Sequence, residues 1–250
     1  LFDGSPVLID EGEFVFPLES GEVRVSLQTG RDRIDINRSS DELLASMFDS
    51  LDVEPDTRRR LVDSILDWRD GNDIANVYGA EISDYDQIGG RRLPANGPFG
   101  SVDELIFVNG MTEELLYGRL VDDLDGGYRR IPGIRDLVTV RSDVGAVNPN
   151  EASVDVLSAL PGMDRVLAQF VARVRTEEAF AGSQDLVERV PALNNSDALN
   201  YLVFDGGDAT AIVARARIEP SGVSRSVRMV LRREERLQFL SLSPLLFRRI

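Results

Sequence analysis

Apolar residues alternate with polar ones near both ends of the chain, and they follow a helical spacing in between. The alternation within residues 12–37 and its return from residue 209 both have the two-residue period of strands. Because a lone hairpin is rarely stable in water, we expect the two sets to share one antiparallel sheet. The apolar positions of the two sets are Phe14, Phe16, Val23, Val25, Leu27, Ile34 and Ile36, then Ile212, Ala214, Ala216, Ile218, Val227, Met229, Leu231, Phe239, Leu240 and Leu242.

Helical patterns fill the middle of the chain. Ser39 opens a Ser-x-x-Glu capping box, and apolar residues follow it at intervals of three and four. A second helix is expected to begin after Pro55 and to end at Asp70-Gly71. A third helix opens with Phe99 and is expected to continue, after a turn, through Leu120.

The helical segments read as two copies of one unit. Two of the matching helices are connected by residues 69–98 in the first copy, and by only residues 176–179 in the second. Turns with one glycine resemble those of helix-hairpin-helix units, but they lack the second glycine and the lysines of DNA-binding members, so we interpret them as packing turns. The matching segments are Asp35-Ile-Asn37 with Val147-Asn-Pro-Asn150, residues 61–68 with 166–174, and Phe99–Leu105 with Phe180–Leu186.

These patterns predict an α+β fold in which a helical domain is inserted into an antiparallel sheet. We expect residues 1–38 to form the first strands and residues 201–250 the remaining strands. The inserted domain is expected to span residues 39–200, with one repeat at 39–120 and the other at 148–200.

Composition narrows the range of functions. The 250 residues carry a net charge of −15, which opposes binding to the phosphates of nucleic acids. Cysteine, histidine and lysine are all absent, which removes the usual zinc ligands, cysteine and serine–histidine nucleophiles and Schiff-base chemistry. We therefore expect a protein without enzymatic activity.

An acidic loop stands out within the extra chain of the first copy. Its sequence runs Asp67-Trp-Arg-Asp-Gly-Asn-Asp73 and continues to Gly79-Ala-Glu81. Asp67 and Asp70 lie one helical turn apart on the same side. Oxygen ligands in a flexible loop suit calcium, although a solvated acidic surface is the alternative interpretation.

The order of the motifs resembles the minor pseudopilin K (GspK) family of bacterial type II secretion systems. The similarity covers nearly the whole chain, and the Asp-Trp-x-Asp run with Gly-Ala-Glu is its most specific part. The motifs that carry it are Asp35-Ile-Asn37, Asp67–Asp73, Gly79-Ala-Glu81, Asn96-Gly-Pro-Phe99, Asp103-Glu-Leu105, Gly110-Met111 and Asn148-Pro-Asn150.

That resemblance implies a pilin-like sheet with a large helical insertion, and a place at the tip of the secretion pseudopilus with other minor pseudopilins as partners. It also implies a periplasmic protein, held in the inner membrane by an N-terminal helix that this sequence lacks. A calcium-dependent module that recognises exported proteins is the alternative. The resemblance implies a structural calcium ion, whose candidate ligands are Asp67, Asp70, Asp73 and Glu81, with Asp84 as a weaker candidate.

Overall fold

The computed structural model describes residues 8–10, 13–28, 30–87, 94, 96–122, 127–142, 144–204, 209–218, 223–232 and 238–245. The chain divides into two compact units, one formed by residues 1–30 with 206–250 and the other by residues 31–205. The sequence patterns placed the corresponding boundaries at 38/39 and 200/201. No helix within the described ranges is both long and apolar enough to cross a membrane.

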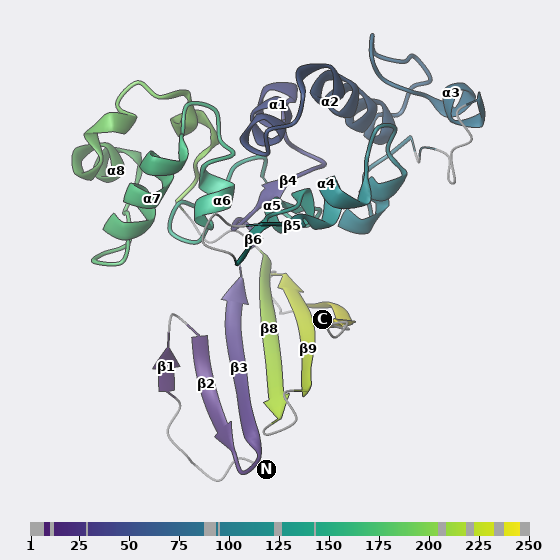
Figure 1. The fold of residues 1–250 in the computed structure, drawn as a ribbon. Coiled ribbons are helices and arrows are strands. Elements are labelled where there is room, and N and C mark those ends of the chain that lie inside the picture. The colour runs from purple at the N-terminus through teal and green to yellow at the C-terminus, as the bar shows by residue number, and fades with distance from the viewer. Residues whose placement is uncertain are drawn as a thin grey trace. The chain divides into compact units, whose positions relative to one another are not determined.

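The first unit is an antiparallel sheet, drawn in the lower part of Figure 1. Its strand order is β1-β2-β3-β8-β9-β10, so strands from both ends of the chain share it, as the alternating patterns predicted. The two sets join where β3 pairs with β8, with Gln28 opposite Ala211. The strands are β1 (Leu8–Asp10), β2 (Glu13–Leu18), β3 (Gly21–Gln28), β8 (Ala209–Ile218), β9 (Val223–Arg232) and β10 (Gln238–Leu245).

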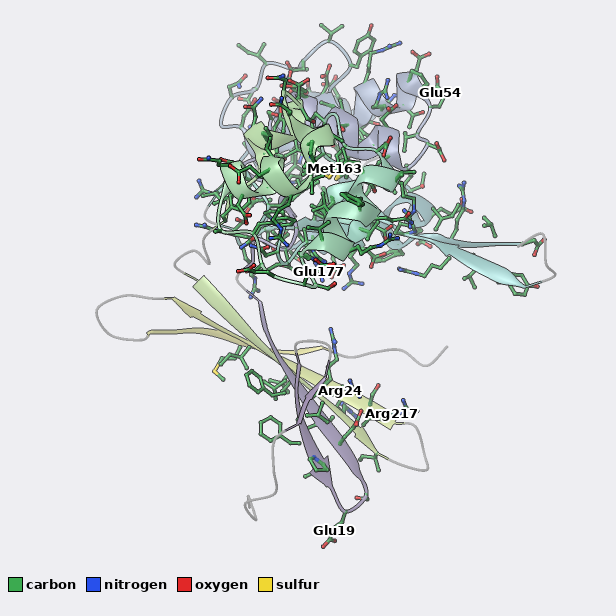
Figure 2. The ribbon with its side chains drawn as sticks, turned by 90° about the vertical axis from the view of Figure 1, so that its left-hand side faces the viewer. Glu19, Arg24, Glu54, Met163, Glu177 and Arg217 are labelled. Carbon is green, nitrogen blue, oxygen red and sulfur yellow. The ribbon has the colours of Figure 1, made fainter. Side chains whose placement is uncertain are left out.

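Charged residues stabilise the junction between β3 and β8. Glu22 lies opposite Arg217 in the register of the two strands, a pairing of opposite charges that favours the sheet. Glu22 also accepts a hydrogen bond of 2.7 Å from Arg24, and Figure 2 shows Arg24 and Arg217 on this sheet. Gly21 is required at the start of β3, because a Cβ there would lie 1.9 Å from the carbonyl oxygen of Arg217.

The expected strand around Ile34 and Ile36 does not belong to this sheet. Instead, β4 (Ile34–Asp35) pairs in parallel with β7 (Val138–Thr139) inside the second unit. Ile34 and Ile36 are buried in the core of that unit. Asp35 between them is also buried, and its carboxylate accepts backbone N–H groups of Asn37 and Ser142, both at 2.8 Å. Because both faces of the segment are covered, its alternation does not indicate a half-exposed strand.

Two helices open the second unit. In α1 (Asp41–Ser50) and α2 (Pro55–Arg69), the predicted apolar stripes are buried. The cap of α1 is Ser40 rather than the expected Ser39, since the Ser40 hydroxyl accepts the Leu43 N–H at 3.2 Å. Glu54, labelled in Figure 2, caps α2 by accepting two backbone N–H groups at 3.0 Å.

The third expected helix is interrupted. A 3-10 helix η1 (Val102–Phe107) and a short α4 (Glu113–Tyr117) replace it, and the chain then forms a hairpin of β5 (Arg119–Asp122) and β6 (Tyr128–Ile131). Gly118 ends α4 with φ of 79°, and a Cβ there would lie 2.4 Å from the Ile131 carbonyl oxygen. The expected helical extension to Leu120 is therefore wrong, because close contact at Gly118 turns the chain into a strand.

Short helices complete the second unit. Residues from both halves of this unit pack into one hydrophobic core. The sequence-based interpretation of two repeats stays a prediction. The remaining elements are α3 (Ile82–Gln87), α5 (Ile134–Leu137), α6 (Val154–Leu157), α7 (Arg165–Val174), α8 (Ser183–Arg189), η2 (Pro191–Leu193) and η3 (Asp197–Tyr201).

Candidate metal centre

The last turn of α2 supplies two carboxylates to the candidate site. Asp67 and Asp70 are three residues apart, so their side chains project from the same side of the helix. Asp70 leaves the helical conformation, while its N–H still donates to the Leu66 carbonyl at 3.1 Å. The helix end therefore holds both carboxylates near the start of the acidic loop.

The loop after α2 folds back onto Asp67. Asn76 donates both its backbone N–H and its side-chain amide to the Asp67 carboxylate, at 3.1 Å and 2.5 Å to Oδ1. Gly79 then passes so close that a Cβ on it would lie 1.8 Å from Asp67 Oδ2. Glycine is therefore the residue that lets the backbone approach this carboxylate.

Glu81 follows that approach and directly precedes α3. Its backbone N–H donates to Asp84 Oδ2 at 2.9 Å, which fixes the first turn of the helix. The Glu81 side chain is buried, and within the described chain neither of its carboxylate oxygens has a hydrogen-bond partner. An unpartnered buried carboxylate is costly, and it points to a ligand at this position.

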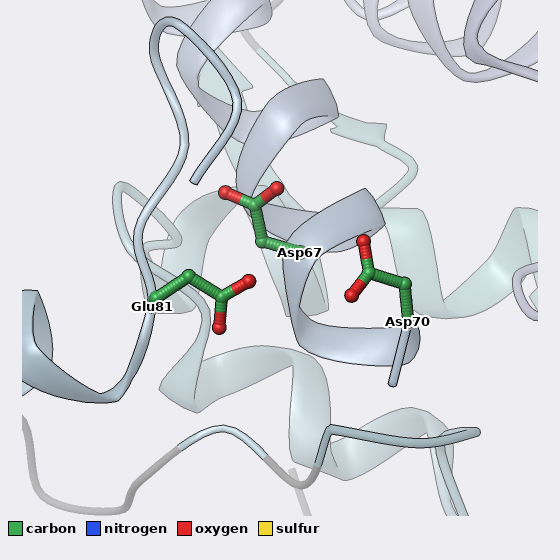
Figure 3. Close-up of side chains that lie close together, drawn as sticks. All are labelled: Asp67, Asp70 and Glu81. Atoms are coloured by element: carbon green, nitrogen blue, oxygen red, sulfur yellow. The ribbon is translucent and has the colours of Figure 1, made fainter. Parts of the chain in front are cut away.

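The three carboxylates of Asp67, Asp70 and Glu81 converge. Each offers an oxygen, and these oxygens lie within 4.8 Å of one another. Figure 3 shows the Glu81 carboxylate directed toward the two aspartates at the end of α2. Asp67 and Glu81 are buried and Asp70 is half-buried.

Burial and mutual repulsion disfavour the negative charges of this cluster. Burial raises the pKa of Asp67, although the hydrogen bonds from Asn76 act in the opposite direction. Burial first, and then the charges of Asp67, Asp70, Asp73 and Asp84, raise the pKa of Glu81 to about 7. A cation among the three carboxylates would remove both penalties.

Three aromatic side chains pack against one another next to the cluster. The Trp68 ring stacks on Phe99 with centroids 5.6 Å apart, and it meets Tyr85 edge-on at 5.8 Å. Tyr85 is itself buried, and its hydroxyl accepts the Asn109 N–H at 2.9 Å. Since Trp68 follows Asp67 directly and Tyr85 lies four residues after Glu81, this packing ties the carboxylates to the core.

The residues present fit a hard cation such as calcium. Calcium prefers carboxylate and carbonyl oxygens in loops of irregular shape, and the cluster supplies three carboxylates without a cysteine or histidine. No described arginine forms an ion pair with Asp67, Asp70 or Glu81 in this part of the chain. The burial of Glu81 without a partner is the observation that favours an ion over a solvated surface.

Two of the five candidate ligands lie beside the cluster and not in it. Asp73 Oδ1 accepts the side-chain amide of Asn96 at 2.7 Å, and one oxygen of Asp84 is used by the Glu81 N–H. Both are close enough for their charges to raise the pKa of Glu81. The structure thus brings Asp67, Asp70 and Glu81 together, and the role of each as a ligand stays a prediction.

Two asparagines of the site were not singled out from the sequence. Asn76 holds the loop on Asp67, and Asn96 holds Asp73 and the Asn72 carbonyl. The Asn96 side-chain oxygen is buried and has no partner within the described residues. Asn96 stands in the Asn-Gly-Pro-Phe motif that carried the family resemblance, which was the available signal, whereas nothing in the sequence marked Asn76.

Comparisons with known proteins bear on the fold and the family. Residues 25–120 match the family model described as type II secretion system (T2SS), protein K. No curated protein matches the chain.

A solved structure shares the fold. A chain of the GspK-GspI-GspJ complex from the type 2 secretion system of enterotoxigenic Escherichia coli matches with a TM-score of 0.64 and 17% identity. The match covers 94% of this chain and 83% of that one. At this identity it shows a common fold, and it confirms the expected mixture of helices with an antiparallel sheet. The family model, which matches residues 25–120, agrees with the sequence motifs in their resemblance to the protein K family of type II secretion systems.

Proposed function

We propose that the protein is a non-enzymatic minor pseudopilin at the tip of a type II secretion pseudopilus, where it supports assembly and protein export. The match of residues 25–120 to the protein K family carries this proposal. The likeness in fold to a chain of the GspK-GspI-GspJ complex, along most of the length of both chains, supports it.

The partners in this proposal are the other minor pseudopilins of the tip. The similar solved structure is a complex of three different proteins, so we infer that this chain assembles with counterparts of GspI and GspJ. Its net charge of −15 disfavours nucleic acid as a partner. The match of residues 25–120 to this family also favours a periplasmic location with an anchor in the inner membrane.

The domain organisation is part of the same proposal. In it, the six-stranded sheet is the pilin-like domain, and the helical unit is an insertion built from two helix-hairpin-helix-like repeats. Strand pairing between β3 and β8 supports the insertion, since residues 31–205 form a separate compact unit between these strands in sequence.

Calcium is the cofactor that we propose for the carboxylate cluster. Asp67, Asp70 and Glu81 would hold it, with Asp73 and Asp84 adding negative charge nearby. The ion would supply positive charge in a buried place, and thereby fix the loop between α2 and α3. Its part is structural, and it requires no catalytic group.

Reconstitution of the tip complex tests the assembly role. The chain is mixed with the I and J proteins of its own secretion system, and the mass of the product is measured by size-exclusion chromatography with light scattering. We expect a complex that contains one copy of each protein. Failure to associate at tens of micromolar, together with binding to exported proteins, would favour cargo recognition instead.

Calorimetric titration tests the cofactor. Calcium is added to chelator-treated protein, with magnesium as the control ion, and thermal unfolding is followed in parallel. We expect calcium to bind selectively and to raise the melting temperature. At a calcium concentration a hundred times Kd, the free energy of unfolding should rise by about 3 kcal/mol. The double variant Asp70→Ala, Asp73→Ala should lose the shift, and an unchanged shift would refute the assignment.

A further inference from the structure

Arg69, between the aspartates of the candidate site, ties the end of α2 to a distant backbone segment. Its guanidinium donates to the carbonyl oxygens of Ile36 and Ser39, the latter at 2.6 Å. Burial lowers the pKa of Arg69, and the nearby charges of Asp35 and Asp70 oppose this. A half-buried cation therefore lies at the C-terminal end of the helix, where positive charge is favoured.

The same backbone segment also holds the far end of the acidic loop. Asn37 lies between the two carbonyls that Arg69 binds. Its side-chain amide donates to the Phe99 carbonyl at 3.0 Å, and its side-chain oxygen accepts the Phe99 N–H at 2.7 Å. Arg69 and Phe99 are therefore both fixed to residues 36–39, and these contacts set the two ends of the loop.

An equivalent set of contacts occurs in the second half of the unit. Arg175, at the end of α7, donates to the carbonyls of Pro149 and Ala152, both at 2.6 Å. Asn150 lies between those carbonyls and exchanges two hydrogen bonds with Phe180, at 3.0 Å and 2.7 Å. Burial lowers the pKa of Arg175 as it does that of Arg69.

Arg69 reaches its two carbonyls through Nη1 and Nη2, whereas Arg175 reaches both through Nη1. The larger difference between the two sets is the length of chain that they enclose. Residues 176–179 close the second set, and they include no group of carboxylates that could hold a metal among the described residues. Residues 70–98 close the first set and carry the acidic loop. The same kind of arginine and asparagine contacts thus occurs once beside the carboxylate cluster and once where the described residues have no such cluster.

We propose that Arg69 is a positioning residue for the cation site, an inference that rests on the proposed binding of calcium. By fixing the last turn of α2 to residues 36 and 39, it sets the orientation of Asp67 and Asp70 before an ion arrives. The second set makes the same kind of contacts around residues 176–179, where the described residues offer no cation site. We therefore expect the contacts of Arg69 and Asn37 to form without the ion, and calcium to order only the interior of the loop. Loss of a group that orients metal ligands lowers metal affinity by about 10- to 100-fold.

Arg175 provides a matched control for this proposal. Arg69→Lys keeps the charge near Asp70 but cannot bridge both carbonyls as a guanidinium does. Arg175→Lys makes the same substitution at the equivalent position of the second set, where a single nitrogen, Nη1, donates to both carbonyls. Cation affinity is read from terbium luminescence sensitised by Trp68, the single tryptophan of the chain, with calcium as competitor.

We expect Arg69→Lys to weaken binding by at least about tenfold, and Arg175→Lys to leave affinity within twofold while lowering the melting temperature similarly. Wild-type affinity in Arg69→Lys, or an equal loss in both variants, would overturn the positioning role. If the wild type itself binds neither terbium nor calcium, the proposed cofactor is what fails.

Hydrogen exchange on the wild-type protein gives a second test, which does not depend on the folding of a variant. The amides of Trp68 to Asp70 should be equally protected with calcium and with chelator, because the contacts of Arg69 and Asn37 hold them. Amides of residues 72–80 should gain protection with calcium. Protection at the end of α2 that requires calcium would overturn the inference.

Discussion

Removing the negative charge of Glu81 should stabilise the protein when calcium is absent. The folded-state pKa of about 7, against an ordinary value of 4.5, means that folding favours the protonated form of this carboxyl. Stability from this group is therefore fully present below about pH 4.5, and it is lost as pH rises toward about 7. At about 1.4 kcal/mol per pH unit, the loss amounts to about 3 kcal/mol as an upper bound.

Glu81→Gln imitates the protonated carboxyl at every pH. In chelator at pH 8, we expect the variant to have a higher free energy of unfolding than wild type, by up to about 3 kcal/mol, and at pH 4.5 we expect the two to be nearly equal. The measurement is urea unfolding followed by Trp68 fluorescence. Glu177→Gln, at an exposed position after α7, controls for the general loss of one negative charge.

Calcium should make wild type more stable than Glu81→Gln, which reverses the order of their free energies of unfolding. Wild type gains stability by binding the ion, whereas Glu81→Gln lacks one of the three clustered carboxylates and should gain little. A variant that is less stable than wild type at pH 8 in chelator would show that the Glu81 charge carries no penalty. The electrostatic reasoning about the cluster would then be wrong.

Two further substitutions test the surroundings of the site. Trp68→Ala should lower the free energy of unfolding by about 3 to 5 kcal/mol, since it empties a fully buried position between two aromatic rings, and urea unfolding followed by circular dichroism would measure this. Gly79→Ala should abolish the calcium-dependent rise in melting temperature, because its methyl group would displace the Asp67 carboxylate. Gly71→Ala is the matched control in the same loop, as a Cβ there meets nothing within 4 Å, and an equal effect of both changes would contradict the role of Gly79.

Long strands and helices were predictable because each contains several periods of its pattern. The strands β3 and β8 carry enough alternating residues to be recognised, and the apolar stripe of α2 ends where Asp70-Gly71 ends the helix. The alternation of Ile34 and Ile36 indicated a strand, but it could not show that β4 pairs with β7 and not with the larger sheet. The two-residue strand β7 is too short for any period to show. The β5–β6 hairpin was missed because it leaves apolar residues such as Leu120 exposed, so burial imposes no alternation on it.

Part of the candidate site follows from local geometry. The spacing of Asp67 and Asp70 predicts a common face of one helix turn, which the structure has. The position of Glu81 depends on the path of the loop, which is set by hydrogen bonds from Asn76 to Asp67 and by close approach at Gly79. Such contacts have no period along the chain, and for this reason the side chains that complete the cluster could not be separated from Asp73 and Asp84.

Pairing of β3 with β8 has a consequence for the order in which the protein folds during synthesis. The strands β1 to β3 leave the ribosome first, but the neighbour that completes them begins only at Ala209. The helical unit, whose residues 31–205 are contiguous, is fully synthesised before that strand exists. Domains generally fold as they leave the ribosome, so we expect the helical unit to fold while the edge of β3 is still unpaired. An unpaired edge can associate with other chains, so we expect the growing protein to be open to aggregation at β3 until β8 is made.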